Sequence, residues 1–268
     1  MAAPRKSQPS AWWTPRDVDE GRSLCFTLGP LSMVLGHGQD EWMLKVESAE
    51  EADSDANSTR LNVRKGLPEE ADERFVHSGE AACVALSPRL ADRPIVIRPR
   101  QPVFLLGGQQ VTLYLSTPVW LRVEVSEPPV LLKEFPVMRM SDTWFGPSTR
   151  DGELCYAGRT HARHHLAELP ERAHRAITPM TIRNDSGKPV PLEKISLPVP
   201  MLSLYGAADG SLWTQRVTLT LEDQAEQARV RIDSDLPEVQ RKLDLLAGPR
   251  IEGGRSGMTR AWNLLLGN

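Results

Sequence analysis

Apolar and polar residues alternate along much of the chain, a pattern that predicts β-strands with one buried face. The clearest run is 111–115, in which every second residue is Val or Leu, and the alternation recurs over 119–125. Gly107-Gly108 precedes the first run and accepts the positive φ angles of a tight hairpin turn. Consecutive strands that share an apolar face must bury it, and in an all-β chain the usual partner is a second sheet. We therefore expect a mainly β protein.

Two later segments share an order of features that indicates an internal repeat. The order is apolar-Pro-Val, large-aromatic-Gly and Asp-Gly-polar-Leu, at residues 135–137, 144–146 and 151–154 in the first copy and 197–199, 204–206 and 209–212 in the second. The connecting loops differ in length, as they do between diverged repeats. Coincidence is the alternative, because Asp-Gly is a common hairpin turn. The repeat predicts two related antiparallel β-sandwich-like halves.

A short C-terminal helix completes the predicted fold. Residues 235–238 resemble a capping box, and Val239, Leu243 and Leu246 follow at helical spacing before Pro249. Between the two copies, residues 160–176 combine helical spacing with a proline, which predicts a short helix or an ordered loop. The chain is thereby divided into a flexible N-terminal tail at 1–20, an N-terminal β domain at 21–130, a second β domain containing the repeat at 131–235, and a C-terminal helix and tail at 236–268.

Composition excludes several classes of protein. The 22 prolines among 268 residues exceed the usual share and argue against a helical bundle, because proline cannot sit inside a helix. A net charge of −3 argues against a basic nucleic-acid binder. The polar start is not typical of a signal peptide, and no run of apolar residues is long enough to span a membrane. The 3 cysteines have no close pairing, which favours reduced thiols and a cytoplasmic protein.

The aromatic-Gly loops of the repeat are the first candidates for a binding surface. They contribute Trp144, Phe145 and Tyr205, and a basic residue follows each copy, Arg159 in the first and Arg216 in the second. These loops would then form the paired lips of one surface that binds a ligand or a protein partner. The alternative is that they only build equivalent corners of two related sheets.

A strip rich in arginine and histidine, residues 159–175, is the strongest charge feature and adds Arg163 to the candidates. His161 and His165 lie four residues apart and would ligate one metal ion from a single helix face. No His-Glu-x-x-His pattern accompanies them, and the neighbouring arginines oppose cation binding. A solvated basic segment that binds an anion or an acidic partner is therefore favoured over a metal site.

No complete catalytic or cofactor-binding motif is present in the sequence. Gly-x-Ser-x-Gly and phosphate-loop patterns are missing, and no cofactor is predicted. Cys155 lies six residues before His161, but its strand-like surroundings favour a buried structural cysteine over a nucleophile. The leading hypothesis is a non-enzymatic cytoplasmic binding or scaffold protein. The alternative is a metal- or anion-dependent hydrolase that uses the histidine cluster.

Residues 181–195, together with the following Leu197–Gly206 segment, resemble a prokaryotic all-β family of unknown function. The resemblance covers roughly residues 95–222. It implies an all-β fold and a prokaryotic source, and it adds no catalytic residues. It also introduces another alternative, an accessory subunit that docks to a membrane protein such as a channel. The strip 159–175 and the apolar patch 262–266 would form that docking surface without any membrane span.

Overall fold

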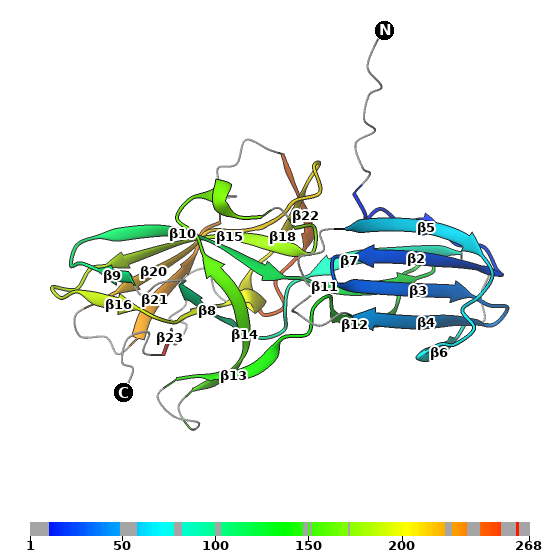
Figure 1. Cartoon of the computed structure of the whole chain (residues 1–268), viewed down its shortest axis with the longest axis horizontal. Helices are drawn as coiled ribbons and strands as arrows, with labels where there is room; N and C mark the ends of the chain where they lie inside the picture. The colour runs from blue at the N-terminus through cyan, green and yellow to red at the C-terminus, as the bar shows by residue number, and fades with distance from the viewer. Residues whose placement is uncertain are drawn as a thin grey trace, which may run out of the picture.

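The structure is a computed structural model, in which two groups of β-sheets lie side by side along the long axis (Figure 1). The described residues are 11–48, 58–77, 82–99, 103–146, 150, 152–170, 172–222, 227–234, 242–252 and 261–262. The prediction of a mainly β protein is confirmed. No helix among the described residues is long and apolar enough to cross a membrane.

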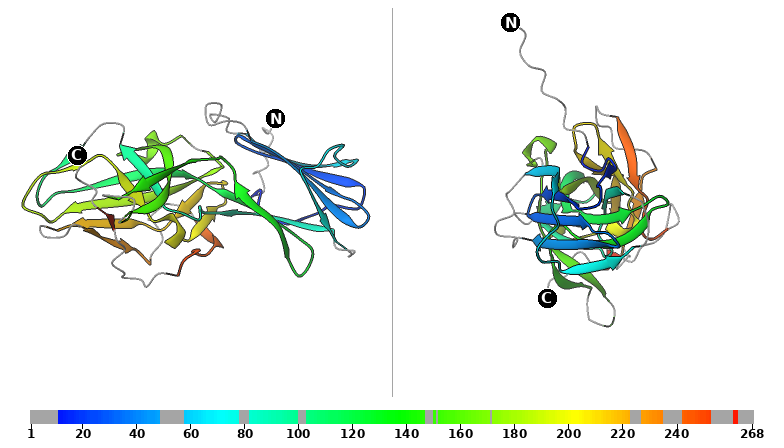
Figure 2. Two further views of the ribbon diagram at one scale, coloured as in Figure 1. Left: turned by 90° about the horizontal axis from the view of Figure 1, so that it is seen from below. Right: turned by 90° about the vertical axis from the view of Figure 1, so that its right-hand side faces the viewer.

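The first group is a sandwich of two antiparallel sheets, seen edge-on in Figure 2. One sheet has five strands in the order β5 (Thr59–Lys65), β2 (Arg22–Leu28), β3 (Leu31–His37), β4 (Glu41–Ser48) and β6 (Glu73–Val76). The other has four, in the order β1 (Arg16–Asp17), β7 (Cys83–Arg89), β11 (Trp120–Val125) and β12 (Val130–Pro136). Alternate residues of these strands are buried, as the period-two pattern requires.

The second group contains the remaining sheets. The largest follows the order β22 (Leu243–Ala247), β18 (Leu204–Ala207), β19 (Leu212–Thr214), β15 (Arg175–Asn184), β20 (Val217–Leu221), β21 (Gln227–Ile232) and β23 (Ala261–Trp262), and β10 (Gln110–Pro118) also pairs with β15. A four-stranded sheet has the order β13 (Ser141–Phe145), β14 (Glu153–Ala162), β8 (Ile95–Pro99) and β17 (Ile195–Leu197). The last is a ribbon of β9 (Val103–Leu105) and β16 (Val190–Leu192).

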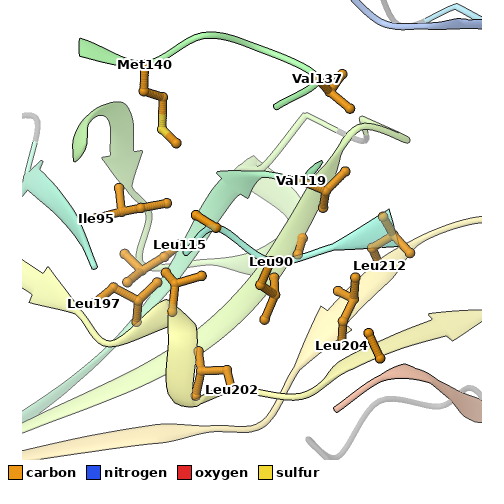
Figure 3. Packing of buried hydrophobic residues seen from close by; sticks show 14 of the residues in the cluster. Leu90, Ile95, Leu115, Val119, Val137, Met140, Leu197, Leu202, Leu204 and Leu212 are labelled. Atoms are coloured by element: carbon orange, nitrogen blue, oxygen red, sulfur yellow. The ribbon is translucent and has the colours of Figure 1, made fainter. Parts of the chain in front are cut away.

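The chain passes from the first group to the second and back before residue 137. Strands β8 to β10 pair in the second group, whereas β11 and β12 pair in the first. One cluster of buried side chains extends through both groups, and Figure 3 shows the part around Leu115, Val119 and Leu204. The sheets therefore do not separate at residue 130, and the division into independent domains remains a prediction.

The predicted C-terminal helix is wrong. Residues 243–247 form strand β22, which pairs antiparallel with β18 and ends before Gly248-Pro249. Residues 235–241, which hold the capping-box pattern, lie outside the described residues. Helical spacing is a weak signal, and here the unpaired backbone groups at the edge of β18 decide the conformation. In the described parts of the chain, the helical elements are two 3-10 turns, Leu166–Glu168 and Val199–Met201.

Each copy of the proposed repeat contains an antiparallel hairpin. β13 pairs with β14 in the first copy, and β18 pairs with β19 in the second. The two hairpins belong to different sheets, and Asp151 of the first copy lies outside the described residues. A duplication, and with it the relation between two halves, therefore remains a prediction.

The turn between β2 and β3 offers a test of how the two groups of sheets fit together. Gly29 has a φ of +56°, and a Cβ atom there would overlap the imidazole of His174. Gly21 has a φ of +76°, and a Cβ atom there would have no other atom within 4 Å. We expect Gly21→Ala to destabilise the fold by about 1–2 kcal/mol through backbone strain alone. Gly29→Ala should cost a further 1–3 kcal/mol, roughly, because packed groups must move.

Urea denaturation of the two variants and the parent measures this difference in the free energy of unfolding. Equal losses for the two alanine variants would show that the Gly29 contact with His174 is not needed for stability.

Candidate ligand-binding site

A large, partly open cavity with a volume of about 1000 Å³ lies among the described residues. Four stretches far apart in sequence form its walls: the segment at Trp12, the residue Thr59, the stretch 166–177 and the β18–β19 turn at 209–213. Ser116 near the end of β10 completes the lining. A concave site of this size lies at the upper end of the range for small-molecule pockets.

Much of the wall is apolar. Trp12 is 4% exposed and packs against Trp13 and Phe26, with ring centroids 5.5 and 5.3 Å away. Trp213 is 2% exposed, and its indole N–H donates to the Ser211 hydroxyl at 2.9 Å. The remaining apolar surface comes from Leu166, Ala167, Leu169, Pro170, Ala173, Ile177 and Leu212. Two indole rings held in place by packing give the cavity a fixed shape.

The polar part of the lining carries more positive than negative charge. Arg175 is 7% exposed, and its Nε and Nη2 donate to the hydroxyl and the carbonyl oxygen of Ser116 at 3.0 and 2.6 Å. Arg172 is half-buried nearby, whereas Asp209 is the acidic residue of the lining. The Asp209 carboxylate accepts from the backbone N–H and the hydroxyl of Ser211. Two guanidinium groups against one carboxylate favour a ligand with a negative charge.

His174 lies between two lining residues and is fully buried. Neither of its ring nitrogens has a hydrogen-bond partner among the described residues. Burial lowers the pKa of His174 to about 4, and the charges of Arg175 and Arg172 act in the same direction. The imidazole is therefore neutral near pH 7, and it packs against Gly29 as an apolar group does.

The six residues predicted to bind a ligand or partner are spread over several sheets. Trp144 on edge strand β13 is 41% exposed, whereas Phe145 is 4% exposed and points into the core. Tyr205 and Arg216 are half-buried, on β18 and before β20. Arg163 is also half-buried, with its backbone bonded to Tyr114 in both directions. The side chain of Arg159 lies outside the described residues.

None of the five residues with described side chains lines the large cavity. Of the two aromatic-Gly loops, only the second contributes, through Asp209 and Gly210. The residues that the sequence missed are Trp12, Ser116, Arg172, Arg175 and Trp213. The sequence did point to two of them, because Arg172 and Arg175 belong to the arginine- and histidine-rich strip 159–175. The sequence does not predict that Trp12 and Trp213 line one cavity, because no sequence pattern places these two tryptophans together.

The helix face required by the metal hypothesis does not form. The backbone of His161 belongs to strand β14, and exposed His165 has extended backbone angles before the 3-10 turn. Residues four apart converge on a helix but not on an extended chain. The side chain of His161 lies outside the described residues, and within these residues no group of three His, Cys, Asp or Glu side chains is placed to hold a metal ion.

Cys155 is fully buried in the centre of the fold, as the sequence predicted. Its Sγ donates to the carbonyl oxygen of Glu153 at 3.6 Å. Burial, reinforced by the charge of Glu153, raises the pKa of the Cys155 thiol to about 12. The thiol therefore stays protonated at neutral pH, which removes the reactivity that a nucleophile needs.

The buried His174 predicts that the protein is less stable in mild acid. The unfolded chain takes up a proton near pH 6.5, whereas the native state resists it until about pH 4. Between these values the unfolded state binds more protons, so stability falls as the pH falls. We expect a loss of about 3 kcal/mol in the free energy of unfolding over this window.

Urea denaturation at several pH values measures this loss, and His174→Leu should abolish most of it. His165→Leu is the matched control, because His165 is exposed and its substitution leaves the buried imidazole of His174 in place. The loss of stability in acid should therefore persist in this variant. A pH profile that is the same in the parent and in His174→Leu would contradict the assignment.

Comparison with known proteins adds a family and no activity. A family described as "Protein of unknown function (DUF432)" matches residues 12–266. No curated protein matches the chain, and no solved structure matches it either. The match covers the cavity-lining residues from Trp12 to Trp213 as well as both groups of sheets. The chain, itself rich in β-strands, belongs to this family of unknown function.

Proposed function

We propose that this protein is a non-enzymatic binding protein that holds an amphipathic ligand with an acidic group in its large cavity. The observation that carries the proposal is the convergence of four distant stretches on a partly open cavity of about 1000 Å³. A concave site of this size, with an apolar lining and a few charged groups, is typical of sites that bind small molecules. An apolar body would lie against Trp12, Trp213 and the Leu166–Leu169 wall.

The acidic group would interact with Arg172 and Arg175. Arg175 is already oriented by its two bonds to Ser116, so little side-chain freedom would be lost when a ligand binds. A guanidinium group in a buried setting interacts more strongly with an anion than one in water does. In this proposal, the part of the strip 159–175 that binds an anion is its C-terminal end, residues 172–175.

The cytoplasmic location, the scaffold role and a protein partner remain predictions from the sequence. The accessory-subunit alternative would use the strip 159–175 and the patch 262–266. Of that patch, only the backbone of Trp262, paired with Gln227 in β23, belongs to the described residues. No contact in the described structure favours this alternative over the cavity.

The hydrolase alternative depends on His161 and His165 binding a metal ion. It predicts stoichiometric metal in protein purified without a His tag, and loss of that metal in His165→Ala. Elemental analysis of the native protein decides between the two functions, because the binding-protein proposal requires no metal.

The fluorescent anion 8-anilinonaphthalene-1-sulfonate combines an apolar body with an acidic group and is a suitable probe of the cavity. We expect saturable binding to the folded protein. Ala167→Trp should weaken it at least tenfold, roughly, because the new indole fills the space. Arg172→Gln should weaken it about fivefold through the loss of one charged contact. Fluorescence titration with direct excitation of the probe measures its affinity for both variants.

Ala208→Trp and Lys194→Gln are matched controls, because both residues are exposed and neither lines the cavity. They should bind the probe as the parent does. Unchanged affinity in Ala167→Trp, with the fold intact by circular dichroism, would show that the cavity is not the binding site.

A further inference from the structure

A second cleft, separate from the large cavity, lies where the two groups of sheets meet. Its volume is about 360 Å³, within the range of small-molecule sites. Trp120 of β11 contributes from the first group, and Tyr156 of β14 and Asp142 of β13 contribute from the second. Arg93 and Arg139, from connections between strands, complete the polar lining.

The aromatic rings of the cleft are held by arginines. The rings of Trp120 and Tyr156 are tilted by 47° with centroids 6.4 Å apart. Arg250 lies over Trp120 at 5.5 Å, and Arg93 lies over Tyr156 at 5.3 Å. The indole N–H of Trp120 is buried, and no described residue accepts a hydrogen bond from it. This nitrogen has almost no exposed surface, so the indole contributes the apolar surface of its ring to the cleft.

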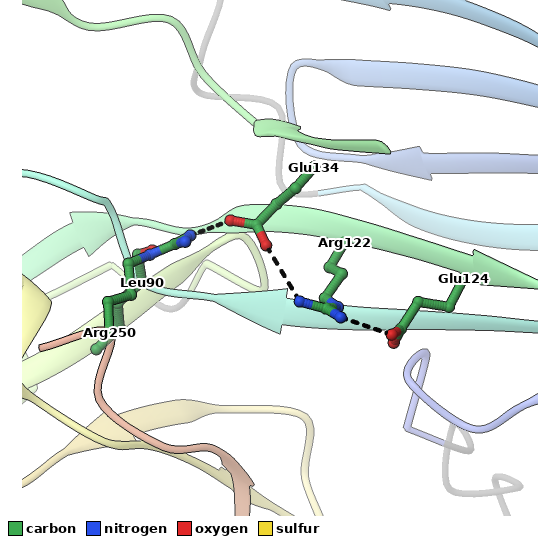
Figure 4. A network of polar contacts seen from close by, with 5 residues as sticks. All are labelled: Leu90, Arg122, Glu124, Glu134 and Arg250. Atoms are coloured by element: carbon green, nitrogen blue, oxygen red, sulfur yellow. Dashed lines mark hydrogen bonds and ion pairs between the residues drawn. The ribbon is translucent and has the colours of Figure 1, made fainter. Parts of the chain in front are cut away.

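A network of charges, drawn in Figure 4, holds Arg250, whose guanidinium group lies over Trp120. Arg250 pairs with Glu134 and donates its Nε to the carbonyl oxygen of Leu90 at 2.7 Å. Arg122 bridges Glu134 and Glu124, at 3.9 and 2.8 Å. The acids in this network are matched by arginines. It therefore serves to position Arg250, and through it the indole ring.

The charges that face the cleft are less balanced. Arg93 pairs with Asp142 at 3.1 Å, whereas Arg139 is exposed and forms no hydrogen bond or ion pair with any described residue. The Tyr156 hydroxyl donates to Asp92 at 2.9 Å. Burial raises the pKa of Tyr156 to about 12, with Asp92 acting in the same direction, so the phenol is neutral. Among the described residues, no anion pairs with Arg139 at the rim of the cleft.

We propose that this cleft binds a small planar anion, an aromatic ring that carries a carboxylate or a phosphate group. The ring packs between the aromatic side chains and Met140, and the acidic oxygens accept from Arg139. Arginine binds both acidic groups through parallel N–H donors, and planar rings suit an aromatic cleft. This site does not depend on the ligand of the large cavity, because the two share no lining residue.

The Trp120 indole N–H signal reports binding directly in nitrogen–proton correlation spectra of labelled protein. The chain has 7 tryptophans, and Trp120→Phe identifies the signal by its disappearance. Benzoate and phenyl phosphate are the two probes, one for each acidic group. We expect one of them at least to shift the Trp120 signal saturably, and the tighter of the two identifies the acidic group of the natural ligand.

Two variants should change the affinity in opposite directions. Arg139→Ala removes a charged donor and should weaken binding about tenfold. Asp142→Asn releases Arg93 from its ion pair and should tighten binding about threefold, an effect that a merely structural role would not produce. Arg60→Ala, at an exposed position on β5 away from the cleft, should change nothing.

The proposal is overturned if neither probe shifts the Trp120 signal at millimolar concentration. It is also overturned if Arg139→Ala and Asp142→Asn both bind as the parent does. Binding of 8-anilinonaphthalene-1-sulfonate in the large cavity should be unaffected by Arg139→Ala, so failure of one site is distinguishable from failure of the other.

Discussion

The passage of the chain through Val119 is the constraint on which the rest of the structure depends. Val119 is fully buried between the end of β10 and the start of β11. Its N–H donates to the carbonyl oxygen of His174 at 3.0 Å, and its own carbonyl accepts from Val137 at 3.1 Å. β10 pairs with β15 along all 9 of its residues, and β11 pairs on both sides in the first group. One buried residue therefore fixes the position of one group of sheets against the other.

Both candidate sites follow from this junction. The large cavity takes Ser116 from the strand just before Val119, and the smaller cleft takes Trp120 from the strand just after it. His174, which accepts the bond from Val119, precedes the buried Arg175. A shift of the chain at Val119 would move lining residues of both sites together. Arg175 lies at the start of β15, whereas Arg172, Arg93 and Arg139 reach these sites from connections between strands, where the sequence has more freedom to vary.

Strands could be predicted from the sequence, whereas contacts between residues far apart in the chain could not. Alternation identified the strands at 111–115 and 119–125, because a strand shows its buried face in every second residue. It did not reveal that neighbouring Trp144 and Phe145 point to opposite sides, one exposed and one buried. The C-terminal helix failed because pairing with β18 outweighed spacing. The cavity was missed because its indoles, Trp12 and Trp213, come from opposite ends of the chain, and no periodic pattern encodes such a meeting.

The pairing of β10 with β15 also bears on how the chain reaches its native state during synthesis. Strands β2 to β5 find their partners within a short stretch of chain, whereas Gln110–Pro118 must wait until Arg175–Asn184 has left the ribosome. During that interval one apolar face of β10 has no sheet to cover it. Pairing over such sequence distances slows folding and exposes a surface that aggregates. Newly made chains should therefore depend on chaperones more than a sandwich of adjacent hairpins does.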